Sequence, residues 1–164
     1  MQIAEEIPED KYGFVPVLGW RSIADLLKHV AWAPMTYEDM HVIKVLPTLK
    51  GYDFSAIFAK RAEKERQQLN KAQILALLKS EGDRVAKYLG ACDEKFLNET
   101  FTDVMGLNPK TRCEQLMSIK EHEMHHRGQL MLIQRMIGLV PHLTREREER
   151  ARQRAAAAAL AGKH

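Results

Sequence analysis

Residues 110–140 read KTRCEQLMSIKEHEMHHRGQLMLIQRMIGLV, and this stretch decides the fold. It contains no proline, and Thr111-Arg112-Cys113-Glu114 has the Ser/Thr-x-x-Glu pattern of a capping box, which predicts where a helix begins. Apolar residues then recur with a helical period at Leu116, Ile119, Leu130, Ile133 and Ile137. Gly138 and Pro141 predict the end of the helix. The stretch is therefore expected to form one long helix with a single core-facing side.

His122 and His126 lie four residues apart near this core-facing side. Side chains at that spacing project together from a helix, so two imidazoles can reach one metal ion. With Glu123 between them, the run also matches the H-E-x-x-H pattern of zinc metallopeptidases. A third interpretation is that both histidines are hydrogen-bonded core residues. The pair alone leaves these alternatives open.

The rest of the chain also predicts helices. Ser22 is an expected N-cap, Pro34 is expected to kink or break the helix that follows, and a second helical stretch should run from 35 to about 46. Ser55 is an expected cap of a polar helix, and Asn70 of a helix ending near Gly90. Residues 93–109 are expected to be a long connection with at most one extended piece. No sheet is predicted, so the fold class is all-α, an antiparallel helix bundle.

Composition limits the function classes. The chain has 164 residues and a net charge of +3. Residues 144–164 account for this charge with six basic and three acidic residues, so residues 1–143 are balanced. We therefore expect one folded domain at 1–143 and a charged, Ala-rich helix or tail at 144–164. The balanced body argues against a nucleic-acid binder. No apolar run reaches the roughly 18 residues that cross a bilayer. The N-terminus lacks a secretory signal, and the two cysteines suggest no disulfide framework. Together these features predict a cytoplasmic protein without membrane contact.

A third ligand would turn the histidine pair into a metal site. His29 is the best candidate, because it is expected on another core-facing helix beside Trp32 and Ala33. Three neutral imidazoles leave coordination positions open for water or substrate, as catalytic metals require. A polar helix residue remains the alternative for His29. The other histidines, His41, His125, His142 and His164, are expected at the surface.

The run H-E-M-H-H-R-G-Q at 122–129, with the helix S-I-A-D-L-L-K-H ending at His29, resembles the DinB-like (damage-inducible) superfamily. The resemblance implies a DinB-like antiparallel four-helix bundle, here with a shortened N-terminal helix and an extra C-terminal helix. It implies a divalent metal, zinc or nickel, held by His29, His122 and His126. Characterised relatives are thiol-dependent S-transferases and an isomerase. This implies a small-molecule substrate and a low-molecular-weight thiol such as bacillithiol, mycothiol or glutathione.

Three functions follow as hypotheses. The first is a metal-dependent thiol S-transferase, in which Gln129 would support the ligands. The second is a zinc metallopeptidase with Glu123 as general base, although such enzymes need a substrate-binding edge strand. The third is a non-catalytic interaction or regulatory bundle. Because the family begins with a longer helix, we also expect a homodimer in which helix 144–161 helps to replace it.

Overall fold

The computed structural model describes residues 1–161, and it is an all-α bundle as predicted. Its longer helices are α2 (Ile23–Trp32), α4 (Phe54–Glu65), α5 (Lys71–Gly90), α7 (Arg112–Met136) and α8 (His142–Ala161). Shorter elements are α1 (Gln2–Glu6), a 3-10 turn (Glu9–Lys11), α3 (Pro34–Glu38), a π-helical turn (Asp39–Ile43) and α6 (Glu94–Asn98). The prediction that no sheet forms is wrong in one place: two short antiparallel strands, β1 (Thr100–Phe101) and β2 (Lys110–Thr111), pair at one end of the bundle, because the turn between them brings the ends of the 93–109 connection together.

Capping residues set the helix starts as the sequence predicts in three cases. The Ser22 hydroxyl accepts a hydrogen bond from the Asp25 amide at the start of α2. Asn70 and Thr111 form complete capping boxes at the starts of α5 and α7. Each cap satisfies a backbone N–H that the helix leaves without a partner, and each typically contributes about 1 kcal/mol of stability.

Other boundaries differ from the prediction. Asp53, not Ser55, caps α4, and the last helix begins at His142 rather than at Thr144. The connection 93–109 contains the helix α6, which Asp93 caps. The second helical stretch begins at Pro34 and ends at Ile43 as a π-helical turn. These differences arise because Asp and Pro begin helices as well as Ser does, and the sequence offers several such residues close together.

Helix α2 lies at the centre of the bundle and packs against α4, α5 and α7. Its apolar side is buried against Ile74 of α5 and Leu130 and Ile133 of α7. Ile3, Ala4 and Ile7 from the N-terminal segment close this core at one end. The packing brings the last turn of α2 opposite the middle of α7, which is where the histidines of both helices lie.

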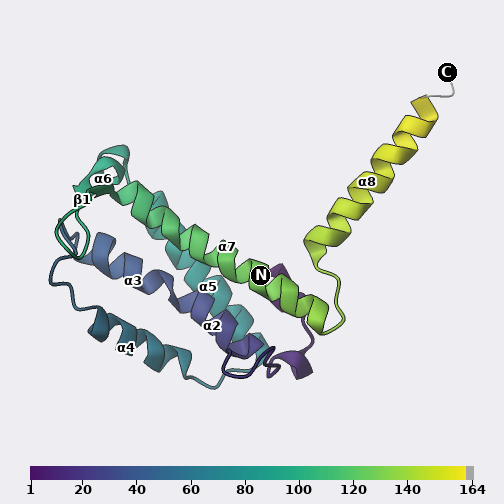
Figure 1. Ribbon diagram of the computed structural model, residues 1–164, viewed down its shortest axis with the longest axis horizontal. Coiled ribbons are helices and arrows are strands. Elements are labelled where there is room, and N and C mark those ends of the chain that lie inside the picture. The colour runs from purple at the N-terminus through teal and green to yellow at the C-terminus, as the bar shows by residue number, and fades with distance from the viewer. Residues whose placement is uncertain (162–164) are drawn as a thin grey trace.

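Helix α8 projects away from the other helices (Figure 1). At its base Arg145 donates to the Glu6 carboxylate (Nη2–Oε1 2.6 Å). Arg135 of α7 also donates to the Thr144 hydroxyl, at 2.8 Å. The side chains of residues 145–160 are exposed. Among residues 1–161, no helix combines the length and apolarity needed to cross a membrane.

Candidate metal centre

His29 in the last turn of α2 meets His122 and His126 of α7, and all three present Nε2 to one another. The His122 Nε2 atom lies 3.1 Å from Nε2 of His29 and 3.1 Å from Nε2 of His126. One nitrogen from each of the three rings lies within 4.8 Å of the others. His29 and His126 are buried and His122 is partly buried. The predicted convergence of the three histidines is therefore observed.

The spacing fits a tetrahedral metal ion. Two nitrogens that each lie about 2.05 Å from a tetrahedral zinc are about 3.3 Å apart, close to the two distances here. Three imidazoles leave at least one coordination position for another ligand. These three histidines could therefore hold a metal ion with an open position.

Each outer ring is oriented by a second partner. His29 Nδ1 lies 2.9 Å from the Glu65 carboxylate of α4, and His126 Nδ1 lies 2.7 Å from the Gln129 side-chain oxygen. Both partners are acceptors in this arrangement, so each Nδ1 carries the proton and each Nε2 presents a lone pair. The sequence suggested Gln129, because it follows His126 by three residues on the same helix. No sequence pattern pointed to Glu65, because it lies on another helix, 36 residues from His29.

This arrangement leaves the three rings without a complete set of hydrogen bonds among themselves. The lone pairs of His29 and His126 both face His122 Nε2, which carries at most one proton. One buried lone pair would then have no donor, and that is costly in the interior. A cation shared by the three nitrogens satisfies all of them, so the chemistry of the donor set fits a metal.

Burial also favours the neutral form of two of the histidines, His122 and His126. Burial lowers the pKa of His122 to about 4, and the neighbouring His126, His29 and Arg61 add to the effect. Burial likewise lowers the pKa of His126, against the hydrogen bond to Gln129, which raises it. At Glu65 burial raises the pKa, but the hydrogen bond from His29 and the charge of Arg61 outweigh it, so the net pKa is lowered. At neutral pH the imidazoles of His122 and His126 are therefore unprotonated, which is the form that binds metals.

A large cleft of about 890 Å³, here named the Trp20 cleft, opens beside the histidines. Trp20 and Arg21 line it from the segment before α2, and Lys28 lines it from α2 itself. The end of α4 contributes Glu65 and Arg66, and α7 contributes His126 and Gln129. A small molecule in this cleft would reach one ligand of the candidate site and the residues that orient two of the rings.

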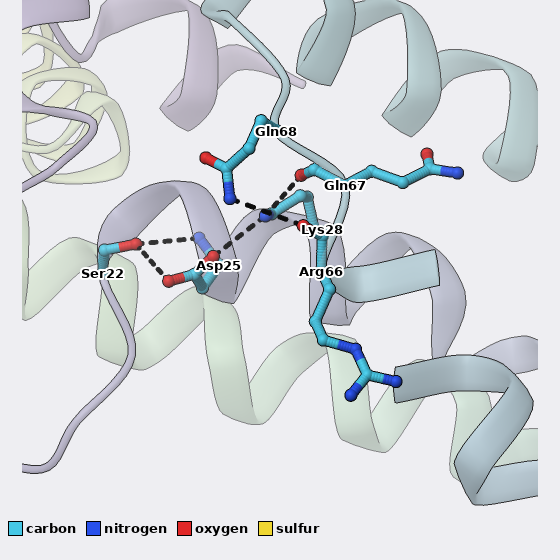
Figure 2. A network of polar contacts seen from close by, with 6 residues as sticks. All are labelled: Ser22, Asp25, Lys28, Arg66, Gln67 and Gln68. Carbon is cyan, nitrogen blue, oxygen red and sulfur yellow. Dashed lines mark hydrogen bonds and ion pairs between the residues drawn. The ribbon is translucent and has the colours of Figure 1, made fainter. Parts of the chain in front are cut away.

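Lys28 is an unusual wall residue, because it is only 3% exposed. Figure 2 shows its ammonium group between the Asp25 carboxylate and the Gln67 carbonyl oxygen, each at 2.9 Å. Ser22 in turn donates its hydroxyl hydrogen to Asp25 at 2.7 Å. The network ties the start of α2 to the loop after α4, and therefore fixes two walls of the cleft relative to each other.

Glu123, the general base of the metallopeptidase hypothesis, does not line the Trp20 cleft. It lines a separate cavity of about 240 Å³, together with Arg127 of the same helix and residues of α1 and α2. Among residues 1–161, β1 and β2 are the strands of the only sheet, and each is two residues long. In the described part of the chain, the Trp20 cleft therefore has neither Glu123 in its lining nor an edge strand longer than two residues.

The remaining histidines only partly follow the prediction. His125 is exposed and lies 2.9 Å from the Gln129 amide nitrogen, and His142 is half-buried. The prediction for His41 is wrong, because this residue is fully buried in the π-helical turn. Its Nδ1 accepts from the Arg112 guanidinium at 3.3 Å, a contact that joins residues 71 positions apart and leaves no local trace in the sequence. His164 lies outside the described residues.

Comparison with known proteins agrees with the sequence pattern. The DinB superfamily matches residues 1–130, a range that contains all three histidines, so the chain belongs to this superfamily. The fold is similar to the crystal structure of a DinB-like protein from Bacillus subtilis, with a TM-score of 0.60 and 23% sequence identity. The similarity covers 85% of this chain and 85% of that one. A search of the curated proteins found no match.

Proposed function

We propose that this DinB-superfamily protein binds a divalent metal, zinc or nickel, through His29, His122 and His126. We further propose that it uses the metal in a thiol S-transfer reaction on a small molecule. The observation that carries the proposal is the meeting of three Nε2 atoms, two at 3.1 Å from the third, with the outer rings oriented by Glu65 and Gln129.

The protein's own residues prepare such a site. Glu65 and Gln129 hold two protons on Nδ1, so that the Nε2 lone pairs point to the common centre. The cleft beside His126 admits a small molecule. A divalent ion on three neutral imidazoles keeps its full charge, and this charge lowers the pKa of a bound water or thiol. A thiolate is the reactive form of a thiol nucleophile.

The thiol is proposed to come from a second molecule rather than from the chain. Cys92 donates its S–H to the Tyr88 carbonyl oxygen at 3.3 Å, and burial together with Asp93 raises the pKa of its thiol. Cys113 is exposed in the first turn of α7, more than two turns before His122. A low-molecular-weight thiol in the Trp20 cleft is therefore the proposed sulfur donor.

Metal analysis of protein purified without a histidine tag tests the metal part of the proposal. After dialysis against zinc or nickel and then against metal-free buffer, the wild type should keep one metal ion per chain, and His126→Ala should lose it. His142→Ala is the control, since it removes a half-buried imidazole that does not line the Trp20 cleft and should keep the metal. A wild type without metal, or a His126→Ala variant that keeps a full equivalent, would overturn the proposal and favour a non-catalytic bundle.

The thiol part is tested on zinc-loaded protein with glutathione and a chromogenic electrophile. Zinc-loaded wild type and His142→Ala should accelerate the reaction, whereas zinc-free protein and His126→Ala should not. Equal rates with and without bound zinc would contradict a metal-dependent transferase while leaving the metal site intact.

A further inference from the structure

The Trp20 cleft carries more positive charge than its carboxylates balance. Its walls include the cations Arg21, Lys28 and Arg66 and the carboxylates Asp25 and Glu65. Both carboxylates already have partners in the protein. Asp25 pairs with Lys28 at 2.9 Å, while Glu65 pairs with His29 at 2.9 Å and with Arg61 at 3.3 Å.

Arg21 and Arg66 remain without such a partner. Within residues 1–161, neither guanidinium group makes a hydrogen bond or an ion pair, although both line the cleft. In Figure 2 the Arg66 guanidinium lies apart from the bonded network of Ser22, Asp25 and Lys28.

We propose that the Trp20 cleft is a binding site for an anionic small molecule, whose negative group pairs with Arg21 and Arg66 and whose other end lies at His126. This inference rests on the proposed function and names the substrate class of the same site. Guanidinium groups present planar sets of donors that match carboxylates and other oxyanions. A cleft lined by cations also concentrates anions from solution.

The buried network around Lys28 supports this proposal. The Asp25 and Gln67 contacts engage the ammonium group of Lys28, so the cation fixes the wall of the cleft and need not bind the ligand. Arg21 and Arg66, which are both exposed, are then the cations available to pair with a bound anion. Trp20, which is about half exposed at 49%, adds an aromatic surface beside them for the apolar part of a small molecule.

The experiment compares two thiols of similar size, the anionic 3-mercaptopropionate and the neutral 3-mercapto-1-propanol. Both are titrated into full-length protein loaded with Co²⁺, and thiolate coordination is followed by the sulfur-to-cobalt absorption band. The wild type should bind the acid about tenfold more tightly than the alcohol, which is the size expected for one charge-assisted contact. In Arg21→Gln/Arg66→Gln, the preference should disappear while the affinity for the alcohol stays the same.

The control Arg147→Gln/Arg154→Gln removes two exposed arginines from α8 and should keep the wild-type preference. Equal affinities of the wild type for both thiols would overturn this inference and leave the metal proposal standing. A preference that survives in Arg21→Gln/Arg66→Gln would also overturn it, because the charge would then be recognised elsewhere. A protein that takes up no Co²⁺ would instead overturn the proposed function, and this inference with it.

Discussion

Glu65 is the residue through which helix α4 is expected to tune metal affinity. Its carboxylate lies 2.9 Å from His29 Nδ1, so this hydrogen bond has a charged acceptor. The Glu65 side chain is only 17% exposed, so the bond is mostly shielded from water. Such bonds contribute about 1.5–3 kcal/mol, and loss of a ligand's outer partner typically weakens metal binding about 10–100-fold. Glu65→Gln keeps an acceptor oxygen and loses the charge, so we expect about a tenfold loss of zinc affinity. Glu65→Ala leaves the His29 N–H without this partner and should approach a hundredfold loss.

The assay is a zinc competition titration against a chromophoric chelator, with circular dichroism to confirm equal helix content. Glu63→Gln is the matched control, because Glu63 is an exposed carboxylate in the same helix. This control should bind zinc as the wild type does. The reasoning is refuted if Glu65→Gln and Glu65→Ala both bind zinc as tightly as Glu63→Gln, since the contact would then have no influence on the ligand.

Three other predictions concern stability and assembly. Burial and the nearby Arg112 lower the pKa of His41 from 6.5 to about 4. Between these pH values the unfolded chain binds a proton at this histidine that the folded chain does not. The stability of the fold therefore falls as the pH drops through this window. The free energy of unfolding, measured by urea denaturation, should fall between pH 7.5 and pH 5, and His41→Gln should make this fall smaller by about 2 kcal/mol. An equal fall in the wild type and the variant would contradict this prediction. Thr111→Ala should cost about 1 kcal/mol, because it removes the cap of α7, and an unchanged urea midpoint would show that the cap is dispensable. We also predict that the wild type is a homodimer, because α8 projects from the bundle and is free to pack against a second copy. Deletion of residues 144–164 should give a monomer, as measured by light scattering. A monomeric wild type or a dimeric truncated protein would rule out this role for the helix.

The sequence predicts the parts of the site that depend on one helix. The H-x-x-x-H spacing on α7 places two histidines on one face, and Gln129 follows them by local geometry. These two features are local because 3.6 residues per turn determine which side chains meet. Placing His29 beside the pair also requires that the apolar faces of α2 and α7 pack against each other, as their apolar periodicity suggests.

The other parts depend on contacts that span the sequence. Glu65 meets His29 across 36 residues, and Lys28 meets the Gln67 carbonyl across 39. Both contacts depend on where α4 docks, and α4 has a polar sequence whose buried residue is Ile57. His41 was misplaced for a similar reason, because its burial depends on Arg112 and Phe101 from distant segments. A polar residue buried by distant partners leaves no periodic signal in its own neighbourhood.

The anchoring of α4 has a consequence for the site. Ile57 is its buried residue and Phe54 is partly buried, and polar contacts also hold the helix, including Glu65 with His29 and the Lys64 ammonium 4.1 Å from the centre of the Trp32 ring. Glu65 therefore links the docking of α4 to the orientation of a candidate metal ligand. Any metal that favours this orientation of His29 also favours the docked position of α4, and by thermodynamic reciprocity a docked α4 favours the metal to the same extent. Because α4 also forms one wall of the Trp20 cleft, we expect the Glu65–His29 contact to couple metal binding to the shape of the proposed substrate site.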